Sequence, residues 1–325
     1  AEDTDPRAAG EAGALRLLSD GVGHRRLSEI PAPQVDADMI DAWRAKVAKS
    51  ARGQVAPLRA LDTIVNGLTL PFDKGMAQER RAFLDLMQTP ERAALIHAFF
   101  AERRAAQQDD LAGAAPRPVQ RVGIVGGGTM GQGIAASALT AGLDVTLVER
   151  DEASAAKAAA GIGKMLEGAV KRGKLDADAA SRMQSQAFRA VSSYDPLAQV
   201  DLVIEAVFES LEVKQEVFRT LDRICRPGAV LATNTSYLDV NEIAAATKGP
   251  QDVLGLHFFA PAQVMKLLEV VRGAETAPEV LASGIALGRK LGKVAVVSGV
   301  CEGFIGNRIY AAYRRHAEYL VMDGA

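Results

Sequence analysis

Cysteine is almost absent from this sequence, since only Cys225 and Cys301 occur among 325 residues. Two such cysteines form neither a disulfide framework nor the spaced ligand clusters of a metal site, so we expect a reducing compartment and no metal centre. No apolar run approaches the roughly 20 residues that cross a bilayer. A charge excess is also lacking: the formal net charge is −2, which argues against nucleic-acid and anionic-membrane partners.

The composition that remains is that of a globular protein, with 48% hydrophobic and 24% charged residues and a length suited to about two domains. The chain starts at Ala1 without a methionine or a signal peptide, and it stops at "EYLVMDGA", just after a helical pattern begins. We therefore expect an internal piece of a longer polypeptide.

The first third of the chain reads as helical. Residues 1 to about 30 are weakly patterned, whereas Met39, Ile40, Trp43 and Val47 fall on one face of a predicted helix. Three further helices are expected over residues 58–68, 78–87 and 91–105, the last with Thr89 as N-cap and Pro90 in its first turn. Polar, Gly and Pro residues then mark a domain boundary near residue 115.

After Pro118 strand and helix patterns alternate. This alternation predicts an α/β fold, a Rossmann-like and mainly parallel sheet with helices on both faces. The expected strands lie in "RVGIVGG", "DVTLVER", "VDLVIEAV", "AVLATN", "VLGLHFF", "KLLEVV" and "KVAVVSG".

A glycine motif follows the first of these strands. Gly126, Gly128 and Gly131 fit G-x-G-x-x-G at a strand-to-helix turn, where helix N–H groups receive the phosphates of a dinucleotide. Glu149 ends the next strand, 18 residues further on, where a carboxylate binds the adenosine ribose. NAD is the predicted cofactor, although Arg150 beside Glu149 leaves NADP open and a purely structural turn is the alternative.

One histidine and one glutamate interrupt the mostly apolar stretch "GLHFFAPAQVMKLLEVV". The stretch reads as two strands, and a return of a dozen residues would bring Glu269 beside His257. A carboxylate on one imidazole nitrogen fixes the tautomer and leaves the other nitrogen to act as a base. The alternatives are a core histidine and a solvated glutamate on an edge strand. By themselves, Ser236 and Asn307 read as residues that cap helices.

Five motifs together resemble the L-3-hydroxyacyl-CoA dehydrogenases of fatty-acid β-oxidation over about residues 119–325. They are "GGGTMGQGIA", "DLVIEAVFESLEVK", "TNTSYLDVNEIA", "GLHFFAPAQVMKLLEVV" and "GFIGNRIY". Residues 57–105 resemble the closing helices of an enoyl-CoA hydratase of the crotonase type. The order of the two resemblances is that of the multifunctional β-oxidation enzymes. It implies crotonase-type helices and a linker over 1–115, an NAD-binding domain over 116–300, and over 301–325 the start of a helical domain.

The resemblance also implies roles for single residues. His257 would be the general base, Glu269 its orienting partner, and Ser236 and Asn307 hydrogen-bond donors to the substrate. Contacts to NAD are implied for Gly126, Gly128, Thr129, Met130, Gly131, Glu149, Val207, Phe208, Glu209, Lys214 and Ser236. The chain departs from the resemblance at Ala260, where many relatives have Asn, so we expect one polar contact to the cofactor to be lost.

The implied function is oxidation of L-3-hydroxyacyl-CoA to 3-oxoacyl-CoA with NAD, in a parent enzyme that also hydrates 2-enoyl-CoA. The expected partner is an acyl-CoA substrate, and the hydratase residues and closing helical domain are expected outside this chain. The implied location is cytoplasmic for a bacterial chain and peroxisomal for a eukaryotic one. Two alternatives stay open: a bare NAD-binding and packing module, and another β-hydroxyacid dehydrogenase.

Overall fold

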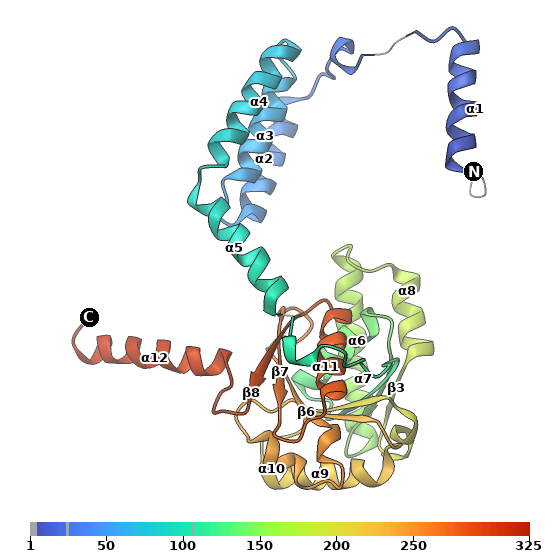
Figure 1. Ribbon diagram of the computed structural model, residues 1–325, viewed down its shortest axis with the longest axis vertical. Coiled ribbons are helices and arrows are strands. Elements are labelled where there is room, and N and C mark those ends of the chain that lie inside the picture. Colours follow the sequence, from blue (N-terminus) through green and yellow to red (C-terminus); the bar gives the residue numbers. More distant parts are fainter. Residues whose placement is uncertain (1–4, 24–25, 106) are drawn as a thin grey trace. The chain divides into compact units, whose positions relative to one another are not determined.

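The computed structural model describes residues 5–23, 26–105 and 107–325. The chain divides into two compact units, residues 1–99 and residues 100–325. Figure 1 shows a helical first unit and a second unit built around a sheet. Each unit is described by itself below.

The first unit contains helices only, among its described residues. The expected helices are confirmed, and Asn66-Gly67 ends the second of them. Thr89 caps the last one, since its Oγ1 accepts a hydrogen bond of 3.3 Å from the N–H of Arg92. The weakly patterned start holds a helix that the sequence reading missed, although Asp5 and Pro6 supply its cap and first turn. The helices are α1 (Pro6–Ser19), α2 (Ala37–Ala51), α3 (Ala56–Gly67), α4 (Phe72–Leu86) and α5 (Pro90–Ala105), which continues into the second unit.

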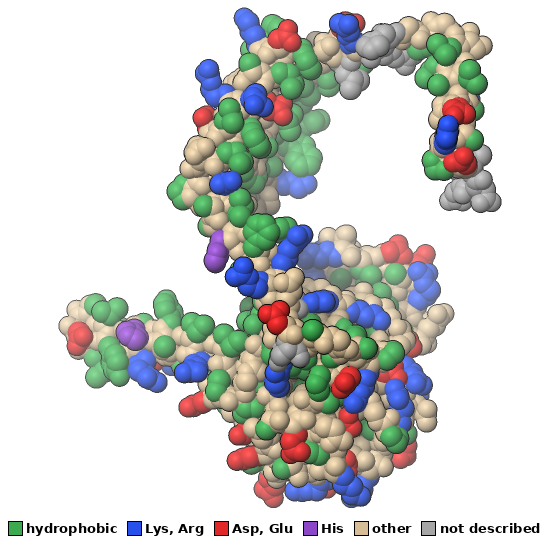
Figure 2. Space-filling view, in the orientation of Figure 1, with side chains coloured by type: hydrophobic (Ala, Val, Ile, Leu, Met, Phe, Trp, Pro, Cys, Tyr) green, Lys and Arg blue, Asp and Glu red, His purple; other side chains and the backbone are tan. Residues whose placement is uncertain are grey.

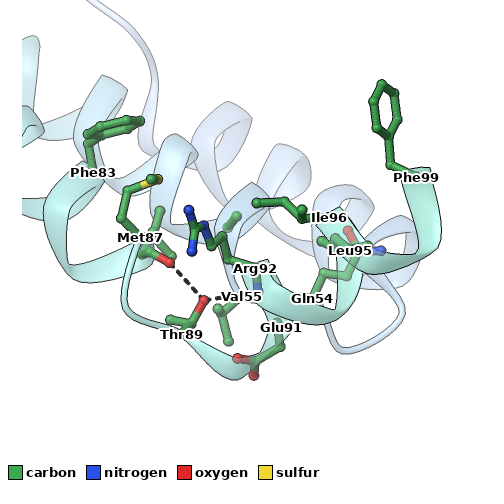
Figure 3. A pocket seen from close by; sticks show the side chains of 12 residues that line it. Gln54, Val55, Phe83, Met87, Thr89, Glu91, Arg92, Leu95, Ile96 and Phe99 are labelled. Atoms are coloured by element: carbon green, nitrogen blue, oxygen red, sulfur yellow. Dashed lines mark hydrogen bonds between the residues drawn. The ribbon is translucent and has the colours of Figure 1, made fainter. Parts of the chain in front are cut away.

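Little of the first unit is buried. Among its described residues only Ala51 and Ala82 are buried, while large apolar side chains such as Phe83 and Leu95 are about half exposed. The start of α3, the end of α4 and α5 line an open apolar pocket of about 410 Å³ (Figure 3). Its walls are formed by Gln54, Val55, Ala56, Phe83, Leu86, Met87, Thr89, Glu91, Arg92, Leu95, Ile96 and Phe99.

The second unit is built on one eight-stranded sheet in the order β3-β2-β1-β4-β5-β6-β7-β8. All neighbouring strands run parallel except β6 and β7, which are antiparallel. The prediction of a mainly parallel sheet is confirmed. The strands are β1 (Arg121–Val125), β2 (Asp144–Val148), β3 (Phe188–Val191), β4 (Leu202–Glu205), β5 (Val230–Thr233), β6 (Val253–Phe258), β7 (Leu267–Arg272) and β8 (Val294–Gly299).

Helices cover both faces of this sheet, as expected (Figure 1). One face packs on α6 (Thr129–Thr140), α7 (Glu152–Lys171) and α11 (Pro278–Lys290). The other face packs on α9 (Leu211–Ile224) and α10 (Val240–Ala244). The inner strands are apolar throughout because both of their faces are covered. A short helix, α8 (Ala177–Arg182), leads toward β3.

The last helix, α12 (Gly306–Met322), has no buried residue. Ile309, Tyr313 and Leu320 are each more than half exposed, and Figure 2 shows hydrophobic side chains along its length. No helix in the described ranges is both long and apolar enough to cross a bilayer.

Asp201 ties the amino ends of β1 and β4 together. Its carboxylate accepts hydrogen bonds from the backbone N–H groups of Gln120 and Arg121 at 2.9 and 2.7 Å and from the guanidinium of Arg226 at 2.8 Å. Burial alone would raise the pKa of Asp201, but these donors outweigh it and lower the pKa below its ordinary value.

Asp201→Asn should therefore lower the free energy of unfolding at neutral pH by about 1–3 kcal/mol. A lowered pKa in the folded state gives stability that is complete above the unfolded pKa, about 3.9, and is lost as the pH falls through the folded pKa. The difference in the free energy of unfolding between wild type and variant should thus become smaller below about pH 4. Urea unfolding followed from pH 7 to pH 3 measures both effects, and a difference that stays constant would contradict them.

Candidate active site

The candidate site lies at the carboxyl ends of the inner strands. The chain passes from β1 to β2 and β3 on one side and then returns to β4 on the other side of β1. Such a reversal opens a crevice outside the carboxyl ends of the strands, where ligands bind in open α/β sheets. The glycine loop follows β1, and the Ser236 loop and His257 lie at the ends of β5 and β6.

The glycine loop has the shape that a dinucleotide requires. Gly126 has φ +99°, and a Cβ there would lie 2.7 Å from the carbonyl oxygen of Ala206. A Cβ on Gly131 would overlap the carbonyl oxygen of Gly126, so only glycine allows α6 to pack on β1 this closely. At Gly128, by contrast, nothing lies within 4 Å of an added Cβ. That open space at the N-terminus of α6 is where a pyrophosphate would approach the backbone N–H groups.

Glu149 is held firmly at the end of β2. Its Oε1 accepts a hydrogen bond of 2.7 Å from the N–H of Gly127, and its Oε2 accepts one of 3.0 Å from the N–H of Arg150. These two hydrogen bonds, from Gly127 and Arg150, fix the carboxylate next to the glycine loop, at the edge of the cleft.

A cleft of about 760 Å³ runs along the glycine loop. The size is within the range of cofactor sites. Seven residues with an expected cofactor role line it: Gly126, Gly128, Thr129, Met130, Glu149, Val207 and Phe208. The shape, the open helix end and the fixed carboxylate fit NAD, which the predicted motif implies.

Sequence reading missed part of this cleft. Ser192 and Tyr194, which follow β3, also line it. Burial, with the nearby charges of Glu205 and Glu149, raises the pKa of the Tyr194 phenol, which keeps the hydroxyl protonated. The signal was weak because β3 is a short edge strand, "FRAV", with no alternating pattern.

His257 and Glu269 face each other across β6 and β7. They are directly opposite in the antiparallel pair, and Nδ1 of His257 lies 2.6 Å from Oε2 of Glu269. The histidine is 3% exposed and the glutamate 0%. The expected return that places these residues side by side is confirmed, and the alternative of a solvated edge-strand glutamate is wrong because β7 lies between β6 and β8.

This contact sets the hydrogens on the imidazole ring. An ionised carboxylate can only accept, so Nδ1 of His257 carries the hydrogen, and Nε2 of the neutral ring has a free lone pair. Two aromatic rings pack against the imidazole, with centroid distances of 4.4 Å to Phe259 and 5.6 Å to Phe304. The arrangement presents Nε2 as a hydrogen-bond acceptor and a base.

The second carboxylate oxygen of Glu269 fixes the start of α12. Oε1 accepts hydrogen bonds from the backbone N–H groups of Ile305 and Gly306, at 3.1 and 2.7 Å. Glu269 thus joins His257 to the helix on which Asn307 follows Gly306 directly. The partial positive charge of the helix N-terminus faces the buried carboxylate.

Gly306 leaves no room for a side chain at this junction. An added Cβ would lie 2.8 Å from Cζ of Phe259, the ring that packs on His257. We expect Gly306→Ala to displace that ring and, for any reaction in which His257 is the base, to lower kcat by roughly 10- to 100-fold, since small misplacements of catalytic groups are costly. Alanine favours helix, so stability should not fall through helix propensity. The matched control is Gly299→Ala, because nothing lies within 4 Å of a Cβ added at Gly299. Equal values of kcat for the two variants would refute the prediction.

Ser236 lies in the loop at the carboxyl end of β5, and Asn307 lies near this loop. Ser236 is partly exposed in the loop after β5, where its N–H donates a hydrogen bond of 2.7 Å to Oε1 of Glu209. Asn307 shares a cavity of about 540 Å³ with Tyr237, the neighbour of Ser236. Asn234, which sequence reading did not single out, accepts a hydrogen bond from the N–H of Phe258 through Oδ1 at 2.9 Å and so ties the Ser236 loop to β6.

Two further residues with an expected cofactor role contact each other, one buried and one exposed. Lys214 is fully buried, and its Nζ lies 2.7 Å from Oε1 of Glu205 and 3.2 Å from Oε2 of Glu209. Burial alone would raise the pKa of Glu209, but hydrogen bonds from Thr235 and Ser236 and the charge of Lys214 lower it. A direct contact of Lys214 with the cofactor stays a prediction.

Within the described ranges, no group of three or more His, Cys, Asp or Glu side chains could hold a metal ion. The fold, the glycine loop and the cleft together define an NAD-binding domain of Rossmann type. The sequence model described as "3-hydroxyacyl-CoA dehydrogenase, NAD binding domain" matches residues 121–301, and the chain belongs to this family.

Full-length relatives extend the match beyond that domain. The chain is 39% identical to the peroxisomal bifunctional enzyme of Cavia porcellus over 320 residues, which is 96% of this chain and 44% of the relative. It is 34% identical to the fatty acid oxidation complex subunit alpha of Shewanella amazonensis over 288 residues, which is 88% of this chain and 41% of the relative. The chain thus spans less than half the length of these relatives.

Solved structures match about two thirds of the chain. The crystal structure of (S)-3-hydroxybutyryl-CoA dehydrogenase from Ralstonia eutropha is 33% identical with a TM-score of 0.62, covering 64% of this chain and 73% of that one. The 3-hydroxybutyryl-CoA dehydrogenase of Escherichia coli K12 is 41% identical with the same TM-score, covering 64% of this chain and 44% of that one.

Proposed function

We propose that this chain carries the dehydrogenase site of a β-oxidation enzyme, which oxidises L-3-hydroxyacyl-CoA to 3-oxoacyl-CoA with NAD. The observation that supports it most is the buried contact of 2.6 Å between His257 and Glu269, at the sheet edge that also bears the cofactor cleft. A buried imidazole with an acceptor nitrogen beside a dinucleotide site suits the oxidation of an alcohol.

In this proposal Nε2 of His257 takes the proton of the 3-hydroxyl as the C3–H bond breaks. The glycine loop and Glu149 would hold NAD, which would supply the hydride acceptor for C3. Glu269 holds the tautomer of His257 and balances the charge that the ring gains. Ser236 and Asn307 donate hydrogen bonds to the substrate oxygens and so position C3. General base catalysis accounts for about 10²–10⁴-fold of the rate, and the rest comes from positioning.

In this proposal the glycine loop binds the pyrophosphate, and the carboxylate of Glu149 accepts hydrogen bonds from the ribose hydroxyls. Glu149→Ala should weaken NADH binding by about 10- to 100-fold, because a charged acceptor is lost. The matched control is Glu152→Ala, an exposed glutamate three residues further along the chain. Fluorescence titration with NADH measures both variants. Equal affinity in the two would contradict the role of Glu149.

The wider setting is also a proposal. Relatives named peroxisomal bifunctional enzyme and fatty acid oxidation complex subunit alpha are more than twice as long as the matched region. We infer a parent chain that also contains an enoyl-CoA hydratase part and a helical dehydrogenase part, located in the peroxisome of a eukaryote or the cytoplasm of a bacterium.

The experiment mixes the chain with NAD and L-3-hydroxybutyryl-CoA and follows the absorbance of NADH. A rise in NADH absorbance with the L substrate, but not with the D enantiomer or with free 3-hydroxybutyrate, supports the proposal. NADH binding without turnover would favour the bare cofactor-binding module. Turnover of the free acid instead would favour another β-hydroxyacid dehydrogenase.

A further inference from the structure

Glu205 is a fully buried carboxylate that directly precedes Ala206 and Val207 of the cofactor cleft. It ends β4 and is 0% exposed. Its Oε1 accepts hydrogen bonds of 2.7 Å from Nζ of Lys214 and from the backbone N–H of Val207. Its Oε2 accepts one of 2.7 Å from Oγ1 of Thr233. A buried charge requires such partners, and losing one leaves the others unsatisfied.

Lys214 continues the network from Glu205 to Glu209. It is 0% exposed and contacts both carboxylates. Oε1 of Glu209 in turn accepts hydrogen bonds from Oγ1 of Thr235 at 2.6 Å and from the N–H of Ser236 at 2.7 Å. An unbroken series of charged contacts therefore runs from the end of β4 to the loop of Ser236.

The cleft wall rests on this network. Val207 and Phe208 line the cleft, and Val213, next to Lys214, lines it as well. The carboxylate of Glu205 accepts a hydrogen bond from the backbone N–H of Val207. It also binds Lys214, the neighbour of Val213 in the sequence. Without Glu205, the N–H of Val207 loses its acceptor and Lys214 loses one of its two carboxylate partners.

We propose that Glu205 is a positioning residue for the cofactor: it fixes the Val207–Phe208 wall of the cleft directly and the Ser236 loop through Lys214 and Glu209. This inference rests on the proposed function, because the cleft must bind NAD. Glu205 does not itself need to touch the cofactor. Its effect is exerted through the backbone of Val207 and the ammonium of Lys214.

The test compares Glu205→Gln with Asp201→Asn in the intact chain. Both substitutions neutralise a buried carboxylate that accepts backbone N–H bonds, but Asp201 lies at the opposite end of β4, away from the cleft. Both variants should unfold at lower urea concentration than wild type. Only Glu205→Gln should weaken NADH binding by about tenfold or more, measured by fluorescence at a temperature where both are folded. Its KM for NAD should rise more than its KM for the acyl substrate.

A double-mutant cycle with Lys214→Met tests the route of the effect. Because Glu205 acts partly through Lys214, the two single losses should overlap, and the double variant should lose less NADH affinity than their sum. Should Glu205→Gln fail to fold, Thr233→Val removes one hydrogen bond from the same carboxylate and should weaken NADH binding by about threefold.

Two results would overturn the inference: a folded Glu205→Gln chain with NADH affinity within twofold of wild type, or losses that simply add in the double variant. A wild-type chain that binds no NADH would instead overturn the proposed function itself. The two failures are therefore distinguishable in one set of titrations.

Discussion

His257→Ala should lower kcat for L-3-hydroxybutyryl-CoA by about 10²–10⁴-fold, the usual contribution of a general base. The substitution removes Nε2, the one acceptor that the fixed tautomer of His257 offers to a substrate hydroxyl, and it leaves the glycine loop and Glu149 untouched. NADH affinity should therefore remain near that of wild type. The loss should appear in kcat, because the proton moves only in the transition state.

The control is His316→Ala, which alters an exposed histidine on α12. This variant should keep the wild-type kcat and NADH affinity. A His257→Ala chain that retains more than a tenth of wild-type kcat would remove His257 from the role of base. A chain that loses NADH binding as well would point to collapse of the site.

Glu269→Gln has the second large expected effect, again a loss in kcat of about 10²–10⁴-fold. The glutamine can accept the N–H groups of Ile305 and Gly306 with its oxygen, but its NH₂ group then faces Nδ1 of His257. A donor at that place requires Nδ1 to accept, which moves the ring hydrogen to Nε2 and removes the base.

The alternative orientation of the glutamine is no better. With its oxygen toward His257, its NH₂ group meets two backbone N–H donors at the start of α12, and those donors lose their acceptor. Circular dichroism and NADH titration should show a folded chain with near-normal cofactor affinity. Glu275→Gln, an exposed position just after β7, is the matched control. Near-wild-type kcat in Glu269→Gln would contradict the role of the carboxylate.

Much of the fold was predictable because its strands are continuous apolar runs. Seven of the eight strands carry such runs, since both faces of the sheet are covered. The strand β3 was missed because it lies at the sheet edge with the short sequence "FRAV". The helix α1 was missed because its residues are exposed and lack an apolar stripe.

The arrangement of the candidate site was predictable where its residues are close in sequence. The glycine motif and Glu149 have a fixed spacing, and the return from β6 to β7 brings His257 to Glu269 within twelve residues. The supports of the site could not be read in this way. Glu205 and Asn234 act through contacts with other strands and loops, and nothing in their local sequence marks those partners.

The most direct measurement uses L-3-hydroxybutyryl-CoA that carries deuterium at C3, with NAD and the wild-type chain. Mass spectrometry of the NADH formed then shows where the deuterium goes. We predict one deuterium in each NADH formed by wild type, and negligible NADH formation by His257→Ala. NADH without deuterium, or a chain that binds NADH and never reduces NAD, would contradict the assignment of a dehydrogenase site to this chain.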